Sequence, residues 1–207
     1  MSAIGNRRST IVMYSDASCI HSHRIRLALA EKSIDAEIVP VKMGEINEDL
    51  LQLSPQGAVP VIVDRDLALY DPRVITDYLD ERYPHPPFMP VDPVSRARTR
   101  LALYRIESDW YSLRPDAPGQ TLSPKEASKR LGESLSAAAP VFAALPYLFS
   151  EEYSILDATL APLLWRLGAY GIVLPKTAAP VAKYAKQMFA RDAFQKSLSD
   201  VEREMEK

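Results

Sequence analysis

The sequence predicts an α/β domain with a mixed sheet, in the order βαβαββα, followed by an all-α domain. Two observations carry this prediction. Short β-like runs alternate with helical ones as far as residue 79, and no β signal remains after the proline-rich stretch that follows. We place the first domain at residues 9–86 and the second at residues 87–207. With 47% apolar and 25% charged residues, the composition is that of an ordinary globular protein.

Short apolar runs mark the strands of the first domain. TIVMY (10–14) is a continuous apolar run, and AEIVPV (36–41) is a second, in which Pro40 indicates a position at the edge of a sheet or an irregularity in the strand. The runs VPVIVD and LALYD flank Arg65 and Asp66, which is the layout of a β-hairpin. We therefore expect two strands followed later by a hairpin.

Three segments between and after these runs are typical of helices. INEDLLQL (46–53) is short and ends at Ser54 and Pro55. In the other two segments, side chains recur at helical spacing: Ile25, Ala28, Leu29 and Lys32 in the first, and Val74, Ile75, Tyr78 and Leu79 in the second.

The second domain is predicted as a series of amphipathic helices. Ser154 and Asp157 stand three residues apart ahead of an apolar run, which indicates a capping box at a helix start. Residues 113–124 hold three prolines and a glycine and predict a loop, and further helical segments lie at 181–191 and 194–205. Two more helix faces are expected: Leu101, Tyr104, Ser108 and Tyr111 on one, and Leu131, Leu135, Ala138 and Phe142 on the other.

Composition disfavours several classes of protein. The formal net charge is −2 with Lys and Arg scattered, so the basic patch that nucleic-acid binding usually needs is missing. Cys19 is the only cysteine, which excludes an internal disulfide and fits a reducing compartment. The first ten residues are not followed by a long apolar stretch, so we expect neither a signal peptide nor a membrane span, and place the protein in the cytoplasm.

Five separated motifs carry a resemblance to a known family: HSHRIRLALAEK, VDRDLALYD, YLDERYPHPPFMPVDPVSRAR, RIESDWY and VEREM. With the Val-Pro pair before the hairpin and SILDATLAPLLWR, the chain resembles the glutathione transferase fold over residues 10–204. Within that fold it is most similar to the stringent starvation protein A family. The resemblance implies a thioredoxin-like first domain and a transferase-type helical second domain.

The resemblance also implies a function. Members of this family keep the transferase fold, associate with RNA polymerase and alter transcription, without being known for conjugation chemistry. We therefore expect a non-enzymatic regulator of the stress response that binds the RNA polymerase holoenzyme; which subunit it contacts, the sigma factor or another, stays open. It should be a homodimer with one domain crossing to the partner's other domain, and it should need no cofactor, metal, membrane or direct contact with nucleic acid.

The resemblance points to a ligand site that has lost its function. Glutathione-binding relatives hold the tripeptide on a cis-proline turn, matched here by Val59 and Pro60, and on an acidic residue followed by serine at a helix start. The second pair is Asp71 and Pro72 here, and proline has neither the hydroxyl nor the N–H. Losing two hydrogen bonds to a carboxylate should cost about 3 to 6 kcal/mol, so we expect no useful glutathione binding.

Cys19 is the nearest match to the nucleophile of serine- or cysteine-dependent transferases, with Ser18, Ser15 and Tyr14 as weaker candidates. It lies just before a helix, near Arg24 and Arg26, where the thiol pKa could be lowered. The competing interpretation is a small residue in a loop, and the family does not characteristically carry a cysteine here.

Other residues that could carry chemistry have structural interpretations. His21 and His23 are two apart at a helix start, where they point in different directions, and no further ligand is near. We therefore predict a structural hydrogen bond for His23 and no metal. Glu107, with Asp109, is predicted to lie on a helix surface or at an interface.

The segment RYPHPPFMP is predicted to be the working surface, and we call residues 83–89 the proline ridge. Its prolines end the preceding helix and hold an extended path, while its large side chains suit either the gap between the domains or a partner. The PHP-containing segment is the proposed polymerase-contacting surface of the family. The predicted partner-binding residues are Tyr83, Pro84, His85, Pro86, Pro87, Phe88 and Met89.

Three alternatives remain open at this stage. The protein could be a glutathione- or thiol-dependent transferase that uses Cys19, or a sensor that binds another metabolite in the same ligand cleft. It could also bind DNA by itself, which the charge balance argues against.

Overall fold

The computed structural model describes residues 11–42, 48–55 and 57–205, and within them four strands form one mixed sheet in the order β2-β1-β3-β4. β1 (Ile11–Ser15) is parallel to β2 (Ala36–Pro40) and antiparallel to β3 (Val61–Asp64), and β3 forms the predicted hairpin with β4 (Leu67–Leu69). β2 lies at the edge of the sheet, as Pro40 predicts. Thr10, the predicted start of the first strand, lies outside the described residues.

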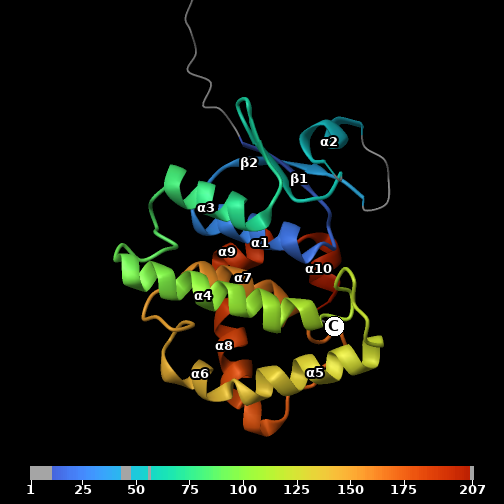
Figure 1. The fold of residues 1–207 in the computed structure, drawn as a ribbon, viewed down its shortest axis with the longest axis vertical. Helices are drawn as coiled ribbons and strands as arrows, with labels where there is room; N and C mark the ends of the chain where they lie inside the picture. Colours follow the sequence, from blue (N-terminus) through green and yellow to red (C-terminus); the bar gives the residue numbers. More distant parts are fainter. Residues whose placement is uncertain (1–10, 43–47, 56, 206–207) are drawn as a thin grey trace, which may run out of the picture.

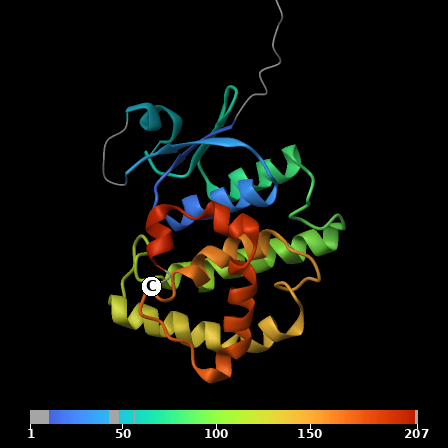
Figure 2. The same ribbon diagram turned by 180° about the vertical axis from the view of Figure 1, so that it is seen from behind.

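Three helices complete the first domain: α1 (Ile20–Glu31), α2 (Glu48–Leu53) and α3 (Pro72–Arg82). The predicted order βαβαββα is confirmed. Residues 46 and 47, predicted to begin α2, lie outside the described residues. α1 and α3 lie between the sheet and the second domain, so any site at their ends also faces that domain (Figures 1 and 2).

The described part of the second domain is helical, as predicted. It consists of α4 (Pro93–Asp109), the 3-10 turn η1 (Tyr111–Leu113), α5 (Pro124–Ala137), α6 (Ala139–Ala144), α7 (Ile155–Trp165), the 3-10 turn η2 (Lys176–Ala178), α8 (Ala179–Phe189), α9 (Asp192–Ser197) and α10 (Asp200–Glu204). The last predicted helix is two helices, because the backbone is extended at Leu198. α9 packs against α1, so the end of the chain returns to the first domain.

α7 lies at the centre of the second domain and all of its residues are buried. The predicted capping box is confirmed, because the Ser154 side chain accepts from the helix start and the Asp157 side chain accepts from the Ser154 N–H. Asp157 also accepts hydrogen bonds from the Leu148 N–H and the Tyr184 hydroxyl, so its buried carboxyl group has partners on three segments.

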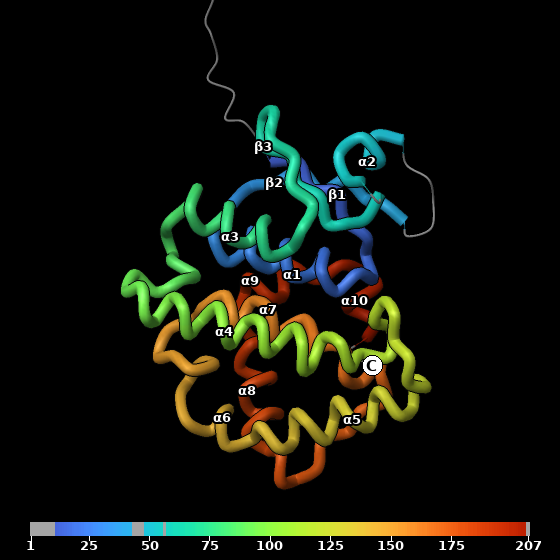
Figure 3. Tube along the Cα trace, viewed as in Figure 1, coloured from blue at the N-terminus to red at the C-terminus, as the bar shows by residue number. Residues whose placement is uncertain are grey.

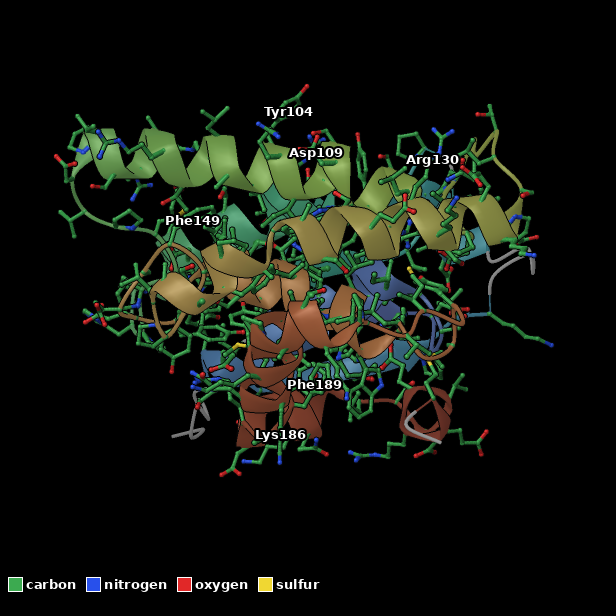
Figure 4. The ribbon with its side chains drawn as sticks, turned by 90° about the horizontal axis from the view of Figure 1, so that it is seen from below. Tyr104, Asp109, Arg130, Phe149, Lys186 and Phe189 are labelled. Carbon is green, nitrogen blue, oxygen red and sulfur yellow. The ribbon has the colours of Figure 1, made fainter. Side chains whose placement is uncertain are left out.

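The predicted face of α4 is not the one that is buried. Leu103 and Ile106 line the core, whereas Leu101 and Tyr104 are each 63% exposed. Tyr111 is buried, but it lies in η1, because α4 ends at Asp109. Figure 4 shows Tyr104 projecting from α4 away from the body of the molecule. α4 therefore presents large apolar side chains on its outer face.

Candidate functional site

Cys19 is the N-cap residue of α1 and lies beside the Val-Pro turn. Its sulfur is 3.9 Å from the carbonyl oxygen of Val59, to which the thiol donates. The Val59–Pro60 peptide bond is cis, as the resemblance implies. The structure thus brings together the cysteine and the turn that were predicted to border one ligand site.

The loop before α1 is held by the carboxylate of Asp16. One oxygen accepts from the backbone N–H groups of Ser18 and Cys19 at 2.7 and 3.0 Å, and from the Ser18 hydroxyl at 2.7 Å. Ser15 is buried, and its hydroxyl accepts from the Arg26 guanidinium. Tyr14 is a residue of β1. Neither serine hydroxyl has a histidine partner among the described residues, so no activating base accompanies these weaker candidates.

The start of α3 uses its own amide groups. Asp71 is the N-cap, and its Oδ1 accepts from the N–H groups of Arg73 and Val74 at 2.8 and 3.3 Å. Its two oxygens also accept from the Arg73 guanidinium, at 3.2 and 3.0 Å. The hydrogen bond from Arg73 lowers the pKa of Asp71. Pro72 is the first helical residue and has no N–H, so this helix start offers an incoming carboxylate little that is unoccupied.

Charged side chains link this helix start to the second domain. Arg24 is buried, and its Nη1 donates to Glu107 Oε1 at 2.7 Å, while Arg73 Nη1 lies 3.9 Å from Glu107 Oε2. Glu107 therefore joins α1 and α3 to α4, which agrees with its prediction as an interface residue.

The His21 ring lies against the Tyr111 ring with 5.5 Å between the ring centroids. Burial, and after it the positive charges of Arg114 and Arg24, lower the pKa of His21 to about 4.

A second charged network joins α1 to the second domain, on the side of the helix opposite to Arg24. Glu202 of α10 is fully buried and pairs with both Arg26 of α1 and Arg166 beyond α7. Arg166 Nη1 also donates to Nδ1 of the buried His23 at 3.0 Å, and His23 Nε2 lies 3.1 Å from Ser197 Oγ. Both ring nitrogens of His23 are occupied, which confirms its predicted structural role. Burial and Arg166 hold the pKa of His23 well below its usual value.

The position of Arg26 bears on the reactivity expected of Cys19. Its guanidinium donates to Glu202, to the Ser197 carbonyl and to Ser15 rather than to the thiol.

The described residues contain no group of three or more side chains that could hold a metal ion.

The proline ridge lies between α3 and α4 at one margin of the molecule (Figure 3). Residues 84–87 are all exposed, Tyr83 is half-buried, and the His85–Pro86 peptide bond is cis. The ridge begins where α3 ends, so it is separated from the Asp71 site by the length of that helix, about 16 Å. The structure therefore gives two separate candidate sites.

Two residues of the predicted partner surface need correction. Phe88 is 1% exposed and Met89 is 5% exposed, so neither can contact a partner without leaving the core. Both residues are buried because the chain crosses the junction between the domains here. The Phe88 ring packs on the Tyr153 ring with 6.2 Å between the ring centroids, and the Phe88 carbonyl accepts from the N–H of Ile155 at the start of α7. The surface that remains is 84–87 with part of Tyr83.

A buried lysine that we did not predict as functional holds the ridge from below. Lys32, the C-cap residue of α1, donates from Nζ to the carbonyl oxygens of Tyr83 and Pro86 and to Asp80 Oδ1, at 2.7, 2.7 and 2.8 Å. Asp80 Oδ1 also accepts from the Phe88 N–H at 2.8 Å. The sequence did contain a signal, because Lys32 is the one charged residue of an otherwise apolar stripe.

The comparisons with known proteins decide the family. Residues 13–87 match the model of the glutathione S-transferase N-terminal domain. The chain is 42% identical over 200 residues to a stringent starvation protein A homolog of Pasteurella multocida, across 96% of this chain and 94% of that one. It is 43% identical over 202 residues to the homolog of Haemophilus ducreyi, with the same coverage. The chain belongs to the stringent starvation protein A family.

Solved structures support the same fold. The Tau class glutathione S-transferase of mango, Mangifera indica, superposes with a TM-score of 0.80 over 96% of both chains at 23% identity. This member of the stringent starvation protein A family therefore has a thioredoxin-like first domain and an all-helical second domain, as predicted. Among its described residues, no helix is long and apolar enough to cross a membrane.

Proposed function

We propose that this protein is a non-catalytic transcription regulator that binds RNA polymerase through the exposed part of the proline ridge, residues 84–87. The observation that carries the proposal is an exposed segment whose backbone is bonded at both ends to one buried lysine. A surface that is rigid before binding loses little conformational entropy when it docks. Membership of the stringent starvation protein A family supports the choice of partner, because the resemblance to that family implies association with RNA polymerase.

The chemistry of the segment limits the surface that it can bind. Pro84, Pro86 and Pro87 have no backbone N–H, so the segment offers carbonyl oxygens, flat pyrrolidine rings and the His85 imidazole. The complementary surface on the polymerase should therefore combine hydrogen-bond donors with aromatic side chains, as grooves that bind proline-rich segments do.

The test is a triple variant, Pro84→Ala, His85→Ala and Pro86→Ala, compared with the unaltered protein. Purified RNA polymerase holoenzyme should be captured by the unaltered protein and not by the variant, and activation of transcription should be lost with it. Circular dichroism and the melting temperature provide the control for folding. A folded variant that captures polymerase as well as the unaltered protein would rule out this surface.

We further propose that the protein does not use glutathione. At the start of α3, Pro72 lacks an N–H, and Asp71 already accepts the next two amide N–H groups. The experiment is a melting curve with millimolar glutathione, in which we expect no clear rise in the melting temperature. A clear rise, or retention on immobilised glutathione, would contradict the proposal.

A thiol-dependent transferase is the second candidate function, because Cys19 lies 3.9 Å from the Val59 carbonyl at the start of α1. This candidate requires a reactive thiol. A thiol probe at neutral pH distinguishes the two functions: we expect a rate no higher than that of free cysteine, whereas a much faster reaction would support the enzyme.

Homodimer formation is part of the proposal. Leu101, Tyr104 and Phe149 are each more than 60% exposed, and Leu101 and Phe149 line a groove of about 630 Å³ beside α4. Exposed apolar groups gathered on one face are typical of an interface. Sedimentation should show a dimer that Leu101→Arg converts to a monomer, and a variant that remains dimeric would place the interface elsewhere.

We place the dimer in the cytoplasm, without direct contact with nucleic acid.

A further inference from the structure

The ammonium group of Lys32 is the most completely buried charge next to the proline ridge. The side chain is 0% exposed, and the ammonium lies 4.4 Å from the centre of the Phe88 ring. An ammonium has three N–H donors, and the three acceptors around it are Asp80 Oδ1 and the carbonyls of Tyr83 and Pro86. Removing such a group from water is costly unless every donor is bonded, which is the case here.

These bonds fix the ridge at points that nothing else in it can fix. Residues 84–87 contain a single backbone N–H, that of His85, so the segment cannot be held by a helix or by a strand ladder. Lys32 instead bonds the carbonyls that bracket Pro84 and His85, and Asp80 bonds the Phe88 N–H on the far side. Two side chains from the first domain thus restrain the ridge at three positions.

Packing alone does not account for a lysine at this position. A methionine would fill much of the same volume without the cost of burying a charge, and replacing a buried ion pair by apolar groups is often neutral for stability. What a methionine cannot do is donate to two carbonyl oxygens. The distinctive contribution of Lys32 is therefore the conformation of the ridge.

We propose that Lys32, oriented by Asp80, is the positioning residue of the polymerase-binding surface. This inference rests on the proposed function, because it concerns the shape of the surface that the polymerase contacts. Lys32 does not touch the partner. It holds Pro84, His85 and Pro86 in the one arrangement that the partner recognises, so that binding does not have to order them.

The test compares three variants with the unaltered protein. Lys32→Met with Asp80→Asn removes both charges together and keeps an acceptor for the Phe88 N–H, so no unpaired charge is left in the interior. Lys32→Gln retains a donor on a shorter, neutral side chain. Leu131→Ala is the matched control, because it destabilises a buried position of α5 in the second domain and leaves the ridge intact.

Two measurements separate positioning from general stability. Amide hydrogen exchange of Phe88, whose N–H donates to Asp80 Oδ1, should become at least about tenfold faster in the double variant, and unchanged relative to neighbouring segments in Leu131→Ala. The protein concentration for half-maximal polymerase capture should rise about tenfold or more in the double variant, because the partner must then order the loosened backbone. It should rise less in Lys32→Gln and stay unchanged in Leu131→Ala.

The outcomes also separate this inference from the proposed function. If the ridge triple variant still captures polymerase, the proposed surface is wrong whatever Lys32 does. If the triple variant loses capture while the folded double variant binds as the unaltered protein does, the positioning role is overturned. If the double variant does not fold, Lys32→Gln decides, and capture equal to that of the unaltered protein overturns the inference.

Discussion

The two ends of α3 use the backbone in opposite ways. At the start, Asp71 accepts the N–H groups that a bound carboxylate would need, and Pro72 has none to offer. At the end, Lys32 draws two carbonyls of the proline ridge inward while the side chains at 84–87 stay exposed. Both regions are well bonded, but only the ridge leaves recognition groups on the surface. A well-bonded backbone therefore indicates a binding site only where exposed groups are left that a partner can contact.

The largest effect should come from restoring the helix start. Pro72→Ser supplies one N–H and one hydroxyl, and hydrogen bonds to a charged group contribute roughly 1.5 to 3 kcal/mol each. Affinity for glutathione should rise by about a hundredfold to ten-thousandfold, measured by titration calorimetry. Pro72→Ala restores the N–H alone and should give an intermediate gain. If Pro72→Ser binds no better than the unaltered protein, the comparison of the two ends fails at its first step.

Glu202→Ala should have one of the two largest effects on stability. The substitution leaves the guanidinium groups of Arg26 and Arg166 without their shared carboxylate, and breaking a buried pair typically costs about 3 to 5 kcal/mol. Urea denaturation measures the loss. Because Glu202 holds the side of α1 away from the ridge, polymerase capture by the protein that remains folded should be unchanged. Equal loss of capture and stability would show that the two regions are coupled.

Acid should weaken the packing of α1 against the second domain, because His21 contacts Tyr111 and His23 contacts Arg166 and Ser197. The pKa of His21 is lowered to about 4, mainly by burial, and that of His23 is also lowered. Between the lowered pKa of each histidine and about 6.5 the unfolded chain binds more protons, so the free energy of unfolding falls as the pH drops, by up to about 1.4 kcal/mol per pH unit for each histidine.

Stability curves of His21→Gln and His23→Gln between pH 7 and pH 5 measure each share. Burial raises the pKa of Asp157 and acts in the opposite sense, so comparing the variants isolates the histidines. Each variant should show a shallower dependence on pH than the unaltered protein. Curves parallel to that of the unaltered protein would mean that the histidines do not titrate on unfolding.

The element order could be predicted from sequence, because it depends on local signals, whereas the Val59–Pro60 turn and the Asp71–Pro72 pair were assigned from the family resemblance. Strand composition, the capping box at Ser154 and the proline at position 72 each act within a few residues. The ion pairs and hydrogen bonds between the two domains could not be predicted, because they join segments far apart in the sequence. Arg26 and Glu202, for example, are 176 positions apart. The outer face of α4 was misassigned for a related reason. Leu101 and Tyr104 have the right spacing for a core, but only the packing partner decides which apolar face is buried.

A smaller effect should follow from loss of the cap at the start of α3. Asp71→Ala removes the acceptor for two backbone N–H groups and should reduce the free energy of unfolding by about 1 kcal/mol. Asp71→Asn keeps a capping oxygen and serves as the control. Because the pKa of Asp71 is lowered in the folded protein, its contribution is present at neutral pH and is lost as the pH falls through that pKa. A loss that is the same at acid pH would point to a different cause.

The smallest effect on stability, and the sharpest contrast between the two regions, is expected for His85→Ala. His85 is exposed, and substitutions at such positions usually change the free energy of unfolding by less than about 0.5 kcal/mol. Phe88→Ala, three residues further along the same ridge, empties a buried site and should cost about 3 to 5 kcal/mol. Denaturation curves of both variants, beside polymerase capture measured where each is folded, should therefore give opposite results. His85→Ala should lose capture and keep stability, and the reverse pattern would assign recognition to the buried part of the ridge.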